Sequence, residues 1–147
     1  MEPIPFHVPS LDERDIPGVV EVLRRRWVTT GPVCRDFETA FGRYLAEGHD
    51  TDLHCVAVNS CTAALHLALE AAGVGCGDAV LTTPFTFTAT AEVVRYLGAD
   101  PLFVDVDGDD FNVSASAYAA ALRALPGSDR RRLKAVVPVH YGGLPVA

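Results

Sequence analysis

The chain has 147 residues, of which 49% are hydrophobic and 21% charged, and its formal net charge is −7 at pH 7. This length suits about one domain, and the apolar fraction excludes wholesale disorder. The acidic balance argues against an extended surface for nucleic acid or an anionic membrane. No apolar run approaches the roughly 20 residues that a membrane-spanning helix needs. We therefore expect a folded protein that binds neither nucleic acid nor membrane.

Residues 1–50 are predicted to form an N-terminal helical segment. Apolar residues recur at helical spacing from Leu11 to Arg26, and a second helix is expected from Val33 to Glu47. Gly31-Pro32 separates the two, because neither residue continues a helix well. The first residues lack the basic and apolar regions of a signal peptide, so a cytoplasmic protein is expected.

Strands alternate with helices over residues 51–147, which indicates an α/β fold. Near-continuous apolar strands favour a mostly parallel sheet with helices on both faces. The last helix is expected to be capped by Asn112 or Ser114, and the first two to end at Gly73 and Gly98. The expected strands are Cys55–Val58, Ala79–Thr82, Pro101–Val106 and Lys134–His140, and the expected helices Thr62–Ala72, Phe87–Leu97 and Ser114–Leu125.

The segment Asn59–Ala63 follows an apolar run and opens directly into a predicted helix. Backbone N–H groups and the helix dipole attract an anion at a helix N-terminus, and small side chains let it approach closely. This segment therefore suits a phosphate group. An ordinary N-cap is the alternative, because Ser and Thr are favoured there regardless of function.

Two further segments follow expected strands. Phe85 and Phe87 come after one strand, and His140-Tyr141 ends another. Ligands of open α/β sheets bind beyond the carboxyl ends of the strands, where an aromatic ring can stack on a flat cofactor. Core packing is the alternative for each phenylalanine. The acidic run Asp105–Asp110 lacks the glycine and the final glutamate of a calcium loop, so no metal site is predicted.

Six motifs in this order resemble the N-terminal part of the DegT/StrS family of pyridoxal-phosphate-dependent nucleotide-sugar aminotransferases. They are Trp27-Val-Thr-Thr-Gly-Pro-x-x-x-x-Phe-Glu38, Asn59-Ser-Cys-Thr-Ala-Ala-Leu-His-Leu-Ala-Leu69, Gly73-Val-Gly-x-Gly-Asp78, Pro84-x-Thr-Phe-x-Ala-Thr90, Gly98-Ala-x-Pro-x-Phe-Val-Asp-Val-Asp107 and Pro138-Val-His-Tyr-Gly-Gly-Leu-Pro145. The resemblance implies an incomplete type I aminotransferase large domain over residues 51–147, pyridoxal 5′-phosphate as cofactor, and a homodimer.

The resemblance also assigns candidate roles. The family's Ser-Gly-Thr-Ala turn binds the cofactor phosphate, which implies the Thr62 hydroxyl and the backbone N–H groups of Thr62 and Ala63. The aromatic residue of the Thr-Phe-x-Ala-Thr motif stacks on the pyridine ring, which implies Phe87. The cofactor-binding candidates are Ser60, Cys61, Thr62, Ala63 and Phe87, and the substrate-side candidates are Thr29, Thr30, Gly31, His140 and Tyr141.

The chain departs from the family pattern in two ways. Cys61 replaces the usual glycine, a change that we expect the turn to tolerate. The family's aspartate that pairs with the pyridine nitrogen, and its Schiff-base lysine, belong to strands beyond Ala147. Lys134, the single lysine, leads into a strand at the opposite end of the expected sheet and cannot replace that lysine. No catalytic residue is therefore assigned.

The resemblance implies transfer of an amino group, commonly from glutamate in this family, to a keto group of a nucleotide-linked sugar. We expect this chain to be an N-terminal fragment of such an enzyme and to be inactive alone. Two alternatives stay open. In the first, the parent protein is a pyridoxal-phosphate-dependent sugar dehydratase of the same family. In the second, the chain is a non-catalytic remnant that binds a sugar or a partner.

Overall fold

The computed structural model describes residues 3–47, 51, 53–106, 108 and 111–146. Its contacts divide the chain into two compact units, residues 1–57 and residues 58–147. The first unit contains α1 (Ile16–Arg24) and α2 (Pro32–Ala46). The second contains, in chain order, α3 (Cys61–Ala71), β1 (Ala79–Thr82), α4 (Ala89–Tyr96), β2 (Asp100–Phe103), α5 (Ala115–Ala124), α6 (Gly127–Arg132), β3 (Leu133–Val136) and the short 3-10 helix η1 (Tyr141–Gly143).

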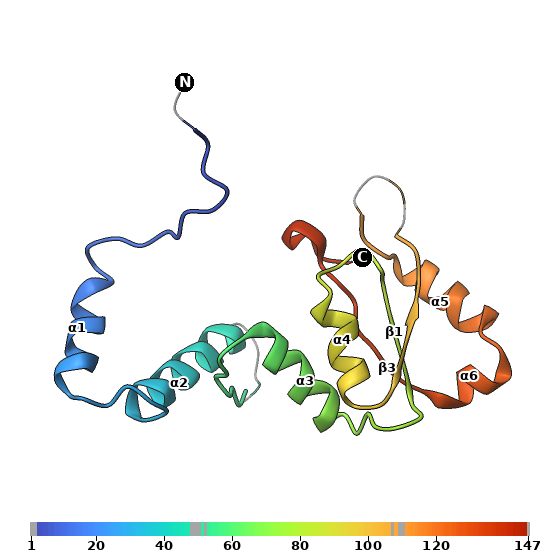
Figure 1. Ribbon diagram of the computed structural model, residues 1–147, viewed down its shortest axis with the longest axis horizontal. Coiled ribbons are helices and arrows are strands. Elements are labelled where there is room, and N and C mark those ends of the chain that lie inside the picture. Colours follow the sequence, from blue (N-terminus) through green and yellow to red (C-terminus); the bar gives the residue numbers. More distant parts are fainter. Residues whose placement is uncertain (1–2, 48–50, 52, 107, 109–110, 147) are drawn as a thin grey trace. The chain divides into compact units, whose positions relative to one another are not determined.

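The sheet of the second unit is parallel, with β1 between β2 and β3 (Figure 1). Ala79 of β1 is in register with Asp100 of β2 and with Leu133 of β3. After β1 the chain pairs on one side with β2 and then crosses to the other side to form β3. The order of the strands therefore reverses around β1, and in open α/β sheets such a reversal opens a crevice at the carboxyl ends of the strands.

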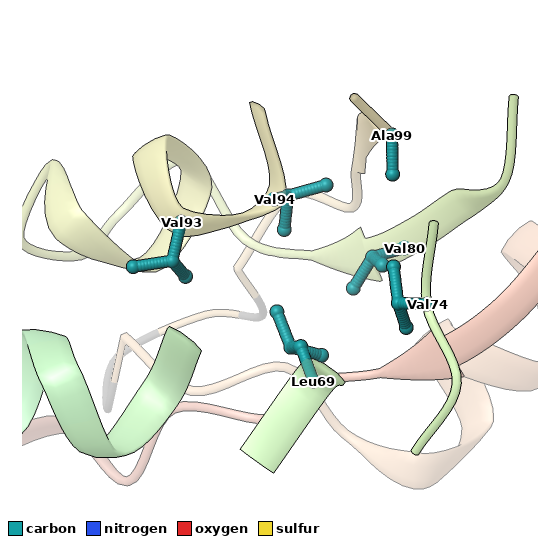
Figure 2. Packing of buried hydrophobic residues seen from close by; sticks show 6 residues of the cluster. All are labelled: Leu69, Val74, Val80, Val93, Val94 and Ala99. Atoms are coloured by element: carbon teal, nitrogen blue, oxygen red, sulfur yellow. The ribbon is translucent and has the colours of Figure 1, made fainter. Parts of the chain in front are cut away.

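Successive residues of β1 direct their side chains to opposite faces of the sheet, and each face is covered. Val80 packs with residues of α3 and α4, in the cluster shown in Figure 2. Leu81 packs on the other face with Val113 and with Tyr118 of α5. All four residues of β1 are buried, which accounts for the uninterrupted apolar run in the sequence.

Glycine ends both α3 and α4 in the same way. Gly73 and Gly98 adopt positive φ angles of 77° and 73°, which a residue without a Cβ adopts at little cost. In each case the next residue donates a hydrogen bond back into the helix, from Val74 N–H to Leu69 O at 3.0 Å and from Ala99 N–H to Val94 O at 3.2 Å. These are Schellman motifs, and their apolar members belong to the cluster of Figure 2.

In the first unit, the segment around Leu53 lies along α2. A Cβ built on Gly42 of α2 would lie 2.7 Å from the backbone oxygen of Leu53, so only glycine permits this approach. The Glu38 carboxylate accepts a hydrogen bond from the N–H of Ala57 at 2.8 Å. This contact bears on the sequence prediction, because it takes a backbone group that a strand would need.

The predicted strand Cys55–Val58 is wrong, since these residues have no sheet partner in the described part of the chain. Val56 is 80% exposed, and Glu38 binds the Ala57 N–H. The prediction for Ala79–Thr82 is confirmed at both ends. The later predicted strands are shorter than expected, and Ser114, rather than Asn112, caps α5. Of the acidic run, Asp107, Asp109 and Asp110 lie outside the described residues.

The helix α6 was not predicted, because its sequence Gly-Ser-Asp-Arg-Arg-Arg has no apolar periodicity. Its position depends on polar contacts instead. Arg130 donates hydrogen bonds to the carbonyl oxygens of Leu122 and Arg123, at 2.7 and 2.6 Å. A cation at the end of α5 satisfies carbonyl groups that the helix itself leaves open.

Candidate functional site

A cleft of about 460 Å³ lies just beyond the carboxyl ends of β1 and β3, where the strand order reverses. Its volume is within the range of about 300–1,000 Å³ that is usual for small-molecule sites. The loop after β1 and the segment after β3 form its walls. The lining residues are Pro84, Phe85, Thr86, Phe87, Val139, His140, Tyr141 and Gly142.

Phe87 is 79% exposed although it lies in this cleft, directly before α4. A phenyl ring that the protein leaves uncovered is available to stack on a planar ligand. Hydroxyl groups order the loop that carries it. Thr83 accepts a hydrogen bond from Phe85 N–H at 3.2 Å, and the hydroxyls of Thr86 and Thr90 are 2.9 Å apart.

Phe85 has a different environment from Phe87. Its ring stacks on Phe111, with centroids 5.0 Å apart, and its centroid is also 5.0 Å from that of Tyr141. Phe111 and Tyr141 meet edge to face at 5.5 Å. We call Phe85, Phe111 and Tyr141 the aromatic trio. It packs the loop after β1 against the segment after β3, so Phe85 is a structural residue of the cleft wall.

A buried amide holds the wall that follows β3. The Asn112 side chain is only 4% exposed and accepts a hydrogen bond from Tyr141 N–H at 2.9 Å. Its Nδ2 donates to Leu144 O at 3.4 Å. His140 is held from its own side, because its Nδ1 accepts from Val146 N–H at 3.0 Å. Sequence reasoning considered Asn112 only as a helix cap, since nothing local indicates a partner 29 residues away.

The N-terminus of α3 carries the phosphate-site candidates. Ser60 is its N-cap, and its hydroxyl accepts from Ala63 N–H at 3.1 Å. The predicted Ala63 donor is thus already used, whereas within the described residues no hydrogen bond engages the N–H of Cys61 or Thr62. Cys61 has ordinary helical geometry and needs no positive φ. These residues do not line the cleft of Phe87.

Thr29, Thr30 and Gly31 belong to the first unit. Thr29 and Gly31 border a small hollow of about 170 Å³ together with Trp27. The Trp27 indole folds over the turn, and its Nε1 donates to Thr30 O at 3.0 Å. A Cβ on Gly31 would lie 2.3 Å from that nitrogen. Trp27 therefore fixes the shape of the Thr-Thr-Gly turn.

A group of ion pairs lies at the amino end of the sheet in the second unit. Asp100, the first residue of β2, forms ion pairs with Arg132 of α6 and Arg95 of α4. The hydrogen bond from Arg132 is the main reason that the pKa of Asp100 is lowered. Lys134 is the second residue of β3, and its side chain lies beside Gly73. It therefore lies in the amino-terminal half of β3.

The fold and the cleft define an α/β protein with a cleft at the switch point of a parallel sheet, where such folds bind their ligands. The chain belongs to the DegT/DnrJ/EryC1/StrS aminotransferase family, whose model matches residues 9–147. The family predicted from the motifs is thereby confirmed. In the described part of the chain, no helix has the length and apolar character to cross a membrane.

Curated and solved relatives agree with this assignment. The chain is 41% identical over 140 residues to the spore coat polysaccharide biosynthesis protein SpsC of Bacillus subtilis, covering 95% of this chain and 33% of that protein. It superposes on an aminotransferase of the family from Brucella abortus with a TM-score of 0.79 and 37% identity, over 89% of this chain and 34% of the other.

A putative sugar aminotransferase, Spr1654 of Streptococcus pneumoniae, gives a TM-score of 0.79 at 35% identity, over 97% of this chain and 33% of the other, and was solved in PMP and PLP forms. The predicted aminotransferase fold is confirmed. The chain spans about a third of the length of these relatives.

Proposed function

We propose that this chain carries part of the cofactor site of an aminotransferase that transfers an amino group from glutamate to a keto group of a nucleotide-linked sugar. The exposed Phe87 ring, in a cleft at the switch point of the sheet, carries this proposal. Family membership and the resemblance to SpsC and Spr1654 support the sugar substrate. We also propose a homodimer in the cytoplasm, which is what the family resemblance implies.

The residues present suit pyridoxal 5′-phosphate in two respects. Phe87 offers an uncovered ring for stacking, and the N-terminus of α3 offers the N–H groups of Cys61 and Thr62 to a phosphate. The small side chains there leave the backbone accessible. When bound, this cofactor supplies an electron sink for the substrate carbon that exchanges a proton.

The chain's own residues would bind and orient the cofactor and the substrate. Phe87 would fix the plane of the ring, and His140 and Tyr141 would close the opposite wall of the cleft. The Thr29–Gly31 turn would contact the substrate, with its shape set by Trp27. We further propose that the base for proton transfer comes from another segment, because Lys134, the single lysine of this chain, lies in the amino-terminal half of β3.

Binding is tested with pyridoxamine 5′-phosphate, which forms no imine with Lys134 and so reports the non-covalent site alone. Equilibrium dialysis of the purified chain is expected to give tighter binding for this compound than for pyridoxamine or inorganic phosphate. Each of those two ligands engages only one of the proposed elements. Equal affinity for all three would contradict the proposal.

Amino transfer is tested separately, with pyridoxal phosphate, glutamate and a nucleotide-linked keto sugar. The chain alone is expected to release no 2-oxoglutarate above a protein-free control. Sustained turnover by the purified chain would contradict the proposed division of labour, in which this chain binds the cofactor and another segment supplies the base.

A further inference from the structure

We propose that Asn112 is a positioning residue, whose buried amide holds the turn of His140 and Tyr141 in place as a wall of the cleft. The proposal rests on the proposed function only in taking this cleft as the cofactor site. The tether itself is a property of the fold. Neither the family motifs nor the predicted elements assign Asn112 such a role.

The first observation is burial combined with long-range hydrogen bonding. Asn112 is 4% exposed and lies in the connection between β2 and α5. It accepts from Tyr141 N–H at 2.9 Å and donates to Leu144 O at 3.4 Å. A buried amide that lost these partners would be costly, so the bonds are expected to persist.

The second observation is the backbone conformation of the preceding residue. Phe111 has a positive φ of 59°, which is uncommon for a bulky residue. With this backbone conformation, the two neighbouring side chains have different environments. The Phe111 ring packs on Phe85 and Tyr141, whereas the Asn112 amide is buried. Two adjacent residues thus hold Tyr141, one by its ring and the other by its backbone.

The third observation is that the turn contains two adjacent glycines and is closed by only two backbone hydrogen bonds in the described structure, Gly143 N–H to His140 O and Leu144 N–H to Tyr141 O, each at 3.1 Å. Gly142 and Gly143 both have positive φ angles, 62° and 81°. Glycine has wide conformational freedom, so contacts from outside the turn are expected to add to these bonds in restricting its shape. The Asn112 side chain bonds to both sides of this turn, because its Oδ1 accepts from Tyr141 N–H and its Nδ2 donates to Leu144 O.

The test is amide hydrogen exchange of the chain, measured by NMR without any ligand. In Asn112→Ala, the exchange rate of the Tyr141 amide is expected to rise about tenfold relative to the Val104 amide, which donates to Thr82 O within the core. Asn112→Asp retains the acceptor for Tyr141, so its Tyr141 amide should change by less than about twofold.

Val113→Ala is the matched control, because Val113 is the next residue, is 2% exposed and has a hydrocarbon side chain that cannot form a hydrogen bond to the turn. This variant should raise the amide exchange rates of Tyr141 and Val104 by a similar factor, since it lowers the stability of the whole core. If the ratio of the Tyr141 to the Val104 amide exchange rate were the same in Asn112→Ala as in Val113→Ala, the proposal would be overturned and Asn112 would be an ordinary core residue.

Affinity for pyridoxamine 5′-phosphate gives the second readout. Asn112→Ala should weaken binding about tenfold more than Val113→Ala at a temperature where both are folded. If Asn112→Ala does not fold, Asn112→Leu takes its place, because leucine has nearly the same shape and keeps neither hydrogen bond, and wild-type affinity in that variant would count against the proposal. Should the wild-type chain bind no pyridoxamine phosphate, the proposed function fails, while the exchange rates still decide the tether.

Discussion

The Oδ1 atom of Asn112 accepts a hydrogen bond from the backbone N–H of Tyr141 at 2.9 Å. This bond joins the connection after β2 to the segment after β3, on a sheet in which those strands occupy opposite edges. The cleft wall therefore depends on a contact between distant parts of the chain. Both this wall and the loop of Phe87 lie at the carboxyl end of the sheet, where we propose that the cofactor ring binds.

Phe87 and Phe85 should respond differently to replacement by leucine. Phe87→Leu is expected to weaken pyridoxamine phosphate binding by about two- to tenfold with little change in stability, because the ring is 79% exposed. Phe85→Leu breaks the aromatic trio and should lower the free energy of unfolding. Dialysis and urea unfolding measure the two effects. Loss of stability in Phe87→Leu without loss of affinity would argue that Phe87 only packs.

The N-caps of α3 and α5 form a matched pair. Ser60 and Ser114 each accept a hydrogen bond from the N–H three residues later, at 3.1 Å. Ser60→Ala and Ser114→Ala should each cost about 1 kcal/mol of stability, measured by urea unfolding. Only Ser60→Ala should also alter the affinity for pyridoxamine phosphate. Equal effects of the two variants on binding would remove α3 from the proposed phosphate site.

Gly31 should be needed for the packing of Trp27. The added methyl group of Gly31→Ala would lie 2.3 Å from the indole nitrogen, so the ring must move and lose its bond to Thr30 O. Because Trp27 is the single tryptophan, its fluorescence reports this directly, and a shift of the emission maximum is expected. Gly18→Ala is the control, since nothing lies within 4 Å of that position. Identical spectra for Gly31→Ala and the wild type would contradict the packing.

Asp100 should give the fold an acid-sensitive link. Its pKa is lowered in the folded chain, mainly by the hydrogen bond from Arg132, so its contribution to stability is present above its ordinary pKa and is lost as pH falls through the lower, folded value. The stability difference between the wild type and Asp100→Asn should therefore be largest near neutral pH and shrink below about pH 4.

Urea unfolding at several pH values measures this difference. Asp12→Asn is the control, because Asp12 also has a lowered pKa but pairs only with the nearby Arg14. It should alter stability less than Asp100→Asn, which disconnects α4 and α6 from β2. A difference for Asp100→Asn that grows on acidification would contradict the sign of this argument.

Local sequence signals account for much of this fold. The apolar run Ala79–Thr82 predicted β1, and Gly73 and Gly98 marked the ends of α3 and α4 because a Schellman motif needs a positive φ. Cys55–Val58 has an equally apolar sequence but forms no strand in the described structure, since strand formation also requires a neighbour.

The candidate site was predicted less completely. Phe87, His140 and Tyr141 follow strands, so their meeting in one cleft could be expected from the parallel topology. The role of Asn112 could not be anticipated, because its partner is 29 residues away and no periodicity encodes a long-range hydrogen bond. The occupied N–H of Ala63 is the usual partner of an N-cap serine, so the N-cap alternative drawn from the sequence did anticipate it.

The most direct test of the proposed cofactor site is an NMR titration of the labelled chain with pyridoxamine 5′-phosphate. The account predicts saturable shifts of the amides of Cys61, Thr62 and Phe87, with one shared dissociation constant. The amides of Lys134 and Asp100, at the amino end of the sheet, should stay unchanged. Saturable shifts confined to that amino end, or no saturable shifts at all, would contradict the account.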